Sequence, residues 1–176
     1  LHDQTNGGID LSIIIVNWNT REHLFNCLSS IYSKSCDVTF EVCVVDNAST
    51  DDSVEMVRRD FPQVKLVMNT ENLGYSKANN LGMQSCTGKN FLLLNSDTII
   101  DPAILKETLV LLESDPHIGA LGCRLFGADG KEQRSHHFDY PFGHIVGSEE
   151  TVTPNGLMEC AYVWGAYFLV RREAVE

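Results

Sequence analysis

Phe91-Leu92-Leu93-Leu94-Asn95-Ser96-Asp97-Thr98 is the stretch of sequence that decides the fold. A continuous apolar run ends here abruptly in amide, hydroxyl and carboxylate side chains, and Val42-Cys43-Val44-Val45-Asp46 ends in the same way. Such runs are typical of strands buried on both faces, because helices cover a parallel sheet above and below. In open α/β sheets, ligands bind beyond the carboxyl ends of the strands. We therefore expect Asp46, Asn95 and Asp97 to lie together at a ligand-binding edge.

Around these two runs, predicted strands alternate with predicted helices. Strands are expected at residues 11–16, 40–45, 64–68 and 90–94. Helices are expected after Thr20, after Ser49 or Thr50, at residues 77–85, and from Asp101-Pro102 to about Ser114, with suitable N-cap or first-turn residues. Repeated strand–helix–strand units predict an α/β fold with a mostly parallel central sheet flanked by helices.

The character of the sequence changes after Pro116. A strand is expected at residues 119–126, a hairpin turn at Ala128-Asp129-Gly130, and a strand at residues 160–171 that Gly165 interrupts. Residues 132–157 are expected to form a long loop. We assign residues 1–10 to a disordered lead-in and residues 11–176 to one domain.

The composition argues against several classes of function. The chain has 176 residues, of which 43% are hydrophobic and 21% charged, and its net charge is −11. This acidity is unsuited to non-specific nucleic-acid binding or to a basic membrane-docking patch. No apolar stretch approaches the ~20 residues of a membrane-spanning helix. The six scattered cysteines contain no C-x-x-C pair and favour a reduced cytosolic setting.

The Asn95-Ser96-Asp97 sequence suits a divalent cation. One carboxylate is a sufficient protein ligand for Mg²⁺ when phosphates and waters complete the octahedron. A cation there stabilises a departing diphosphate as a Lewis acid. A strand-end Asx turn is the alternative interpretation. We favour Asp97 as a metal ligand because of its position at the end of a buried strand.

Other side chains are candidates for ligand contact. The Asp46 carboxylate can accept a hydrogen bond from the imide N–H of a pyrimidine base or from a ribose hydroxyl, or it can cap the turn at residues 49–52. Gly74 suits a turn in which the backbone approaches a ligand. Trp164 is a candidate wall for sugar stacking and equally a candidate core residue.

Five blocks of sequence, in order, carry a resemblance to a known family. They are residues 12–19, residues 44–51, residues 72–75 with 78–82, residues 94–98, and residues 163–166 with 170–174. Together they resemble family 2 glycosyltransferases with the GT-A fold, a Rossmann-like nucleotide-diphospho-sugar transferase sandwich, and in particular the rhamnosyltransferase-like members of bacterial polysaccharide and cell-wall synthesis.

The resemblance implies an inverting, hexosyltransferase-type enzyme that moves a sugar from a UDP- or dTDP-sugar to a glycan or lipid-linked acceptor with Mn²⁺ or Mg²⁺. It implies a cytoplasmic protein, peripheral at the inner membrane face. By the same resemblance Asp97 holds the metal. The implied donor-binding residues are Val16, Asn17, Asn19, Asp46, Asn79, Asn95, Ser96, Asp97 and Trp164.

The resemblance also implies that the general base lies downstream of residues 170–174. We therefore expect no catalytic residue in this sequence, and we interpret it as truncated at its C-terminus before a general base that lies beyond Glu176. We expect such a fragment to transfer sugar slowly if at all. Two alternatives stay open. One is a sugar-nucleotide nucleotidyltransferase, disfavoured because no Gly-rich loop follows the first strand. The other is a non-catalytic nucleotide-binding module of the same fold.

Overall fold

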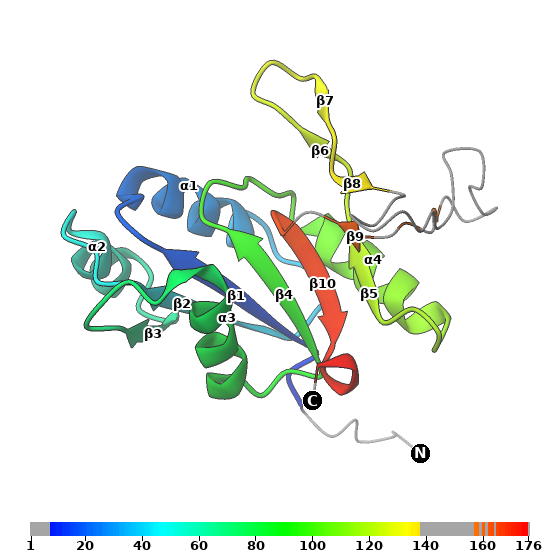
Figure 1. Ribbon diagram of the computed structural model, residues 1–176, viewed down its shortest axis with the longest axis horizontal. Coiled ribbons are helices and arrows are strands. Elements are labelled where there is room, and N and C mark those ends of the chain that lie inside the picture. Colours follow the sequence, from blue (N-terminus) through cyan, green and yellow to red (C-terminus); the bar gives the residue numbers. More distant parts are fainter. Residues whose placement is uncertain (1–7, 138–156, 159, 161, 164, 176) are drawn as a thin grey trace.

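Six strands form one sheet in the order β3-β2-β1-β4-β10-β5 (Figure 1). The computed structural model describes residues 8–137, 157, 158, 160, 162, 163 and 165–175. Neighbouring strands from β3 to β4 are parallel, and β10 is antiparallel to both β4 and β5. The sheet is therefore mostly parallel, as predicted. Its strands are β1 Leu11–Asn17, β2 Phe40–Asp46, β3 Lys65–Met68, β4 Asn90–Asn95, β5 Ala120–Gly122 and β10 Tyr167–Arg171.

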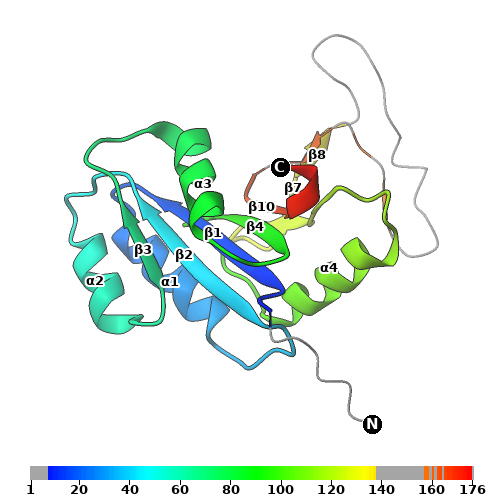
Figure 2. The same ribbon diagram turned by 90° about the horizontal axis from the view of Figure 1, so that it is seen from below.

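Helices cover both faces of this sheet (Figure 2). Alternate residues of β1 are buried on opposite faces, with Ile13 and Ile15 in the larger apolar cluster and Ile14 in the smaller one. The larger cluster takes the apolar side chains of α1, α2 and α4, whereas the smaller one takes Ala78 of α3. Burial on both faces explains the continuous apolar runs. The helices are α1 Arg21–Ile31, α2 Ser53–Asp60, α3 Gly74–Ser85 and α4 Ala103–Ser114.

Two short antiparallel ribbons follow the main sheet. The predicted strand at 119–126 divides into β5 and β6 Leu125–Phe126, and β6 pairs with β7 Glu132–Gln133 across the predicted hairpin turn. The hairpin projects from the body of the domain (Figure 1). The expected loop at 132–157 is wrong in its first part, because β8 His136–His137 pairs with β9 Tyr162–Val163. Residues 138–156 lie outside the described chain.

Two helices begin elsewhere than the sequence predicts. α2 begins at Ser53, and neither Ser49 nor Thr50 caps it, because both bond to the loop after β1 instead. α3 begins at Gly74 rather than Lys77, since Gly74 has φ +76° and its N–H donates to Asn72 Oδ1 at 2.9 Å. Glycine adopts this left-handed conformation without steric cost.

Arg171 and the 3₁₀ turn Arg172–Ala174 that follows β10 attach the end of the sheet to the helices. The Arg171 guanidinium donates to the Ile118 carbonyl at 2.8 Å, to the Asp115 carbonyl at 3.1 Å and to the Leu112 carbonyl. These carbonyls lie at and beyond the C-terminal end of α4, where a cation is favoured. The side chain of Arg171 therefore has a structural role.

At the amino edge of the sheet, part of the predicted lead-in is held in place. The Asp10 carboxylate pairs with Lys89 at 2.7 Å and accepts a hydrogen bond from Thr39. The described chain is therefore anchored before β1 begins. No helix within the described residues is long and apolar enough to span a bilayer.

Candidate functional site

The carboxyl ends of β2, β1 and β4 meet at one edge of the sheet. In the parallel register Asp46 lies opposite Asn17, and Val16 lies opposite Asn95. Ser96 and Asp97 follow directly after β4. The structure therefore brings Val16, Asn17, Asp46 and the 95–97 segment to the same edge, as the sequence predicts.

A row of hydrogen bonds crosses this edge from β2 to β4. Asn17 is fully buried, and its Nδ2 donates to Asp46 Oδ1 at 2.8 Å. Asn17 Oδ1 accepts a hydrogen bond from Thr20 Oγ1 at 2.7 Å, and Thr20 Oγ1 lies 2.9 Å from Ser96 Oγ. The sequence pattern predicts Thr20 only as a helix cap. Its hydroxyl instead connects the ends of β1 and β4, so the four polar side chains form one unit.

Asp46 is almost completely buried, with 3% of its surface exposed. Its second oxygen, Oδ2, accepts a hydrogen bond from the Ser49 backbone N–H at 2.9 Å. The carboxylate therefore organises the turn after β2, which is the alternative role considered from the sequence. Two carboxylate oxygens offer about four acceptor positions, so these two bonds leave capacity for a ligand donor.

The loops after β1 and β2 are fastened to each other by side-chain bonds to backbone groups, an arrangement we term the loop strap. Ser49 Oγ accepts a hydrogen bond from the Asn19 N–H at 3.0 Å, and Asn19 Oδ1 accepts one from the Thr50 N–H at 2.8 Å. Asp51 Oδ2 accepts one from the Arg21 N–H at 2.8 Å. The loop strap therefore ties the two loops to each other.

Three residues in these loops have strained backbones. Asn19, Ala48 and Asp52 have φ values of 54°, 60° and 60° although none is a glycine. Such left-handed conformations cost about 1–3 kcal/mol each and persist only where surrounding contacts determine them. The loop strap supplies those contacts. Backbone strain of this kind clusters at ligand-binding sites.

Asp51 lies at the N-terminal ends of two helices. Its Oδ1 accepts hydrogen bonds from the Ser53 N–H at 3.2 Å and from Ser53 Oγ at 2.5 Å, in addition to the Arg21 bond. Partial burial raises the pKa of the Asp51 carboxyl, but the hydrogen bonds from Ser53 and Arg21 outweigh it and hold this pKa below its ordinary value. The negative charge also suits the positive ends of the α1 and α2 dipoles.

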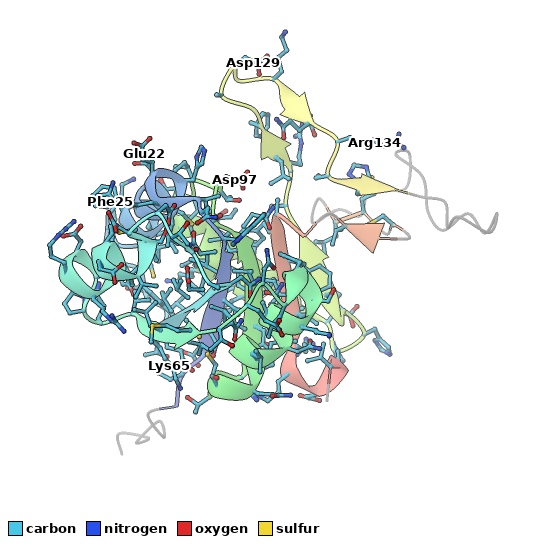
Figure 3. The ribbon with its side chains drawn as sticks, turned by 60° about the vertical axis from the view of Figure 1, so that its left-hand side comes forward. Glu22, Phe25, Lys65, Asp97, Asp129 and Arg134 are labelled. Atoms are coloured by element: carbon cyan, nitrogen blue, oxygen red, sulfur yellow. The ribbon has the colours of Figure 1, made fainter. Side chains whose placement is uncertain are left out.

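Asp97 is exposed at the carboxyl edge (Figure 3). Within the described part of the chain, no hydrogen bond or ion pair engages its carboxylate. The Cys27 thiol donates to the carbonyl of Asn95, two residues before Asp97, at 3.6 Å. Burial raises the pKa of Cys27 to about 12, and the negative charge of Asp97 adds to this effect. Asp97 is therefore a solvent-facing carboxylate beside a buried, neutral thiol.

Asn79 and the turn before β10 lie on the α3 side. Asn79 is 3% exposed, and its Nδ2 donates to the Tyr75 carbonyl at 3.0 Å. The Tyr75 hydroxyl donates to the Gly165 carbonyl at 2.9 Å, and a Cβ at Gly165 would lie 3.0 Å from that hydroxyl. The lack of a side chain at Gly165 therefore leaves room for the Tyr75 ring. Trp164, predicted as a donor contact, lies outside the described residues.

Trp18 is a candidate contact that sequence analysis missed. It follows the buried strand β1 directly, yet 56% of its side chain is exposed. The sequence pattern that could have indicated Trp18 is an aromatic residue between two asparagines, directly after a buried strand. An exposed indole at a ligand edge offers a face on which a base can stack.

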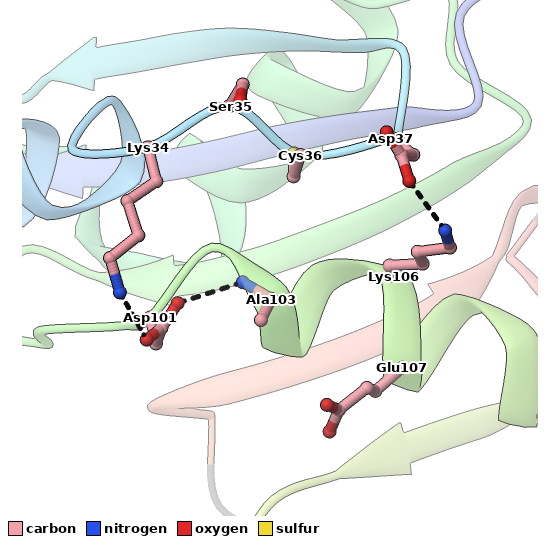
Figure 4. A pocket seen from close by; sticks show the side chains of 8 residues that line it. All are labelled: Lys34, Ser35, Cys36, Asp37, Asp101, Ala103, Lys106 and Glu107. Atoms are coloured by element: carbon pink, nitrogen blue, oxygen red, sulfur yellow. Dashed lines mark hydrogen bonds and ion pairs between the residues drawn. The ribbon is translucent and has the colours of Figure 1, made fainter.

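Hollows in the surface of the described residues lie away from these side chains. One, of about 260 Å³, lies between the α1–β2 connection and the start of α4 (Figure 4). Four of its charged groups form ion pairs, Lys34 with Asp101 at 2.9 Å and Lys106 with Asp37 at 2.7 Å. Because it contains none of the predicted site residues, we place the functional site at the open carboxyl edge.

One family of known proteins matches almost the whole of this chain. The family model described as "Glycosyl transferase family 2" matches residues 12–176. The O-antigen biosynthesis protein RfbC of Myxococcus xanthus is 31% identical over 178 residues, covering 93% of this chain and 14% of RfbC. Poly(ribitol-phosphate) beta-N-acetylglucosaminyltransferase TarS of Staphylococcus aureus is 26% identical over 124 residues, covering 68% of this chain and 22% of TarS.

Solved structures agree with the fold. The mannosyltransferase PcManGT from Pyrobaculum calidifontis, in complex with GDP-Man and Mn²⁺, has a TM-score of 0.60 at 27% identity, covering 69% of this chain and 37% of that one. S. aureus TarS 1–349 in complex with UDP-GlcNAc has a TM-score of 0.64 at 24% identity, covering 75% and 39%. These likenesses confirm the GT-A fold. The chain spans 14% to 36% of the length of the curated relatives it matches.

Proposed function

This chain belongs to glycosyl transferase family 2, and from that membership we propose that it binds the nucleotide-sugar donor of a metal-assisted, inverting glycosyl transfer. The donor is a UDP- or dTDP-sugar and the acceptor is a glycan or a lipid-linked acceptor. One observation supports this proposal most strongly. The exposed Asp97 carboxylate, which no described residue binds, lies at the carboxyl edge beside the hydrogen bonds that join Asp46, Asn17, Thr20 and Ser96. The family match favours this function over the nucleotidyltransferase alternative.

The nucleoside part of the donor would lie over the ends of β1 and β2. Asp46 has remaining acceptor positions for a base imide or a ribose hydroxyl, and Asn17 fixes the orientation of its carboxylate. The exposed indole of Trp18 would stack on the base. Because the loop strap already holds both loops, little conformational entropy is lost when the donor binds.

The diphosphate would lie toward the end of β4. No cluster of three or more acidic, histidine or cysteine side chains converges among the described residues, so the protein would offer a divalent cation the single Asp97 carboxylate. This donor set fits Mg²⁺ or Mn²⁺, which commonly bind through one or two carboxylates together with substrate phosphates. When bound, such a cation neutralises charge on the departing diphosphate. Ser96, held by Thr20, fixes the backbone that carries Asp97.

Two relatives support this assignment by what they bind. PcManGT is solved with GDP-Man and Mn²⁺, and TarS with UDP-GlcNAc. Both ligands are nucleotide-diphosphate sugars, although their bases differ. We therefore propose that this chain binds a nucleotide diphosphate with a divalent metal, and that the base is a pyrimidine whose imide N–H donates to the Asp46 carboxylate.

Isothermal calorimetry with UDP, dTDP and GDP, each with and without Mn²⁺, tests the proposal. We expect Mn²⁺ to tighten UDP or dTDP binding by about tenfold or more, which is roughly 1.4 kcal/mol. Asp97→Asn should remove this gain while leaving the melting temperature unchanged, because no described residue forms a hydrogen bond or an ion pair with the Asp97 carboxylate. Asp101→Asn is the matched control, since that exposed aspartate pairs with Lys34. An equal Mn²⁺ gain in wild type and Asp97→Asn would refute the assignment.

A further inference from the structure

Helix α3 lies close to strands β1 and β2. A Cβ at Gly82 would overlap Ile14 Cγ2 and would lie 3.1 Å from Val45 Cγ2. One helical turn beyond Gly82 is Cys86, which caps the C-terminal end of α3. Two residues before Val45, on the same face of β2, is Cys43. The helix advances about 6 Å over that turn and the strand about 6.6 Å over two residues, so the register places Cys86 over Cys43.

Contacts and burial agree with this register. Cys43 is fully buried and Cys86 is 5% exposed, and both belong to the smaller apolar cluster. Both are free thiols. Each thiol acts on the other: the neighbouring Cys86 thiol raises the pKa of Cys43, and the neighbouring Cys43 thiol lowers the pKa of Cys86.

Charged groups nearby act on both sulfurs. Lys65 lies opposite Cys43 in the β2–β3 register, and its positive charge favours both thiolates. Glu41 has the opposite effect. In contrast, burial raises the pKa of Cys27 to about 12 and that of Cys123 to about 11. Among these cysteines, Cys86 has the thiolate best suited to attack a disulfide.

We propose that Cys43 and Cys86 are a modification site, a thiol pair that a small-molecule disulfide oxidises to an intramolecular disulfide joining β2 to the end of α3. The Cys86 thiolate attacks one sulfur of the small disulfide and releases one small thiol. The Cys43 thiol then loses its proton, attacks the Cys86 sulfur and releases the second small thiol. Two electrons and two protons pass from the cysteines to the small disulfide.

Access to Cys86 requires a local opening of the α3–β4 connection. Cys86 lies at the helix end, where its carbonyl accepts a hydrogen bond from Arg172 at 3.0 Å. Lys65, next to the thiol pair in the β2–β3 register, lies at the opposite end of the domain from Asp97 (Figure 3). The disulfide would therefore leave the proposed donor site open, and this inference does not depend on the proposed function.

The test is oxidation of the chain with oxidised glutathione, followed by alkylation of remaining thiols and peptide mass mapping without reduction. We expect a linked peptide pair containing Cys43 and Cys86, a loss of two titratable thiols, and a higher melting temperature that returns to its starting value on reduction. Cys43→Ala and Cys86→Ala should each abolish the linked pair and the rise. Cys36→Ala, which removes a partly buried cysteine elsewhere, should retain both.

Three outcomes would overturn the proposal. The first is a linked pair that maps to other cysteines. The second is a stable glutathione adduct on Cys86 without ring closure in the wild type. The third is an equal rise in melting temperature for the wild type and Cys43→Ala. Circular dichroism of each reduced variant establishes that it is folded before oxidation, and Cys43→Ser replaces Cys43→Ala if the alanine variant is not.

Discussion

Replacing Gly82 with alanine tests the close packing of α3 on the sheet. The added methyl group would overlap Ile14 Cγ2 and lie 3.1 Å from Val45 Cγ2. Both neighbours are fully buried in central strands. Isoleucine and valine are stiff at χ1, so neither methyl group can rotate away without moving the backbone. Relief therefore requires α3 to shift outward.

Two opposing contributions determine how much Gly82→Ala changes the free energy of unfolding. Alanine in a helix interior is favoured over glycine by about 1 kcal/mol. Overpacking a filled core costs about 1–3 kcal/mol, and the rigid neighbours of Gly82 place this variant in the upper part of that range. We expect a net destabilisation of about 1–2 kcal/mol. For a chain of this length, that corresponds to a melting temperature lower by about 2–8 °C.

Urea unfolding and thermal melting followed by circular dichroism measure this difference. The matched control is Gly119→Ala, where Ala174 Cβ at 3.8 Å, an ordinary contact, is the one neighbour within 4 Å among the residues that the structure describes. The control should lie within about 0.5 kcal/mol of wild type. If Gly82→Ala is as stable as wild type or more stable, the helix does not pack on the sheet as closely as described.

Two further variants test the other contacts. Arg171→Met removes the donors to three carbonyls at and beyond the end of α4 and should destabilise the chain by about 2–4 kcal/mol. Arg171→Lys should recover less than half of that stability, because an ammonium group cannot reproduce the guanidinium fork. Urea unfolding measures both variants, and an Arg171→Met variant as stable as wild type would contradict the structural role of Arg171. The lowered pKa of Asp51 means that its carboxylate stabilises the fold above the ordinary carboxyl pKa of about 3.9 and that this stabilisation disappears as the pH falls through the folded-state pKa. The difference in melting temperature between wild type and Asp51→Asn should therefore be largest at pH 7 and should disappear below about pH 4. A difference that stays constant with pH would show that the charge of Asp51 does not contribute to stability.

The strands of the parallel half of the sheet could be predicted from the sequence almost to the residue. β2 and β4 are continuous apolar runs that end in polar side chains, and this pattern arises directly from burial on both faces. The position of β10 could not be predicted in this way. Its sequence shows that it is a strand, but no local pattern specifies that it lies between β4 and β5 or that it runs antiparallel to both.

The candidate site was predictable in location but not in its internal bonds. Asp46, Asn95 and Asp97 could be placed at one edge because each ends or follows a parallel strand. The roles of Thr20 and Ser49 could not, since serine and threonine before a helix usually indicate a cap. Their hydroxyl groups instead bond across loops that are distant in sequence, and only the folded arrangement of those loops decides between the two outcomes.

The place of β10 has a consequence for biosynthesis. As the ribosome extends the nascent polypeptide, β4 and β5 emerge before the strand that separates them. At roughly 5–20 residues per second, residues 167–171 follow β5 after a few seconds. During that interval the free edge of β4 can pair with a strand of another nascent chain. Rapid translation of residues 123–166 would therefore protect this protein from aggregation during its synthesis.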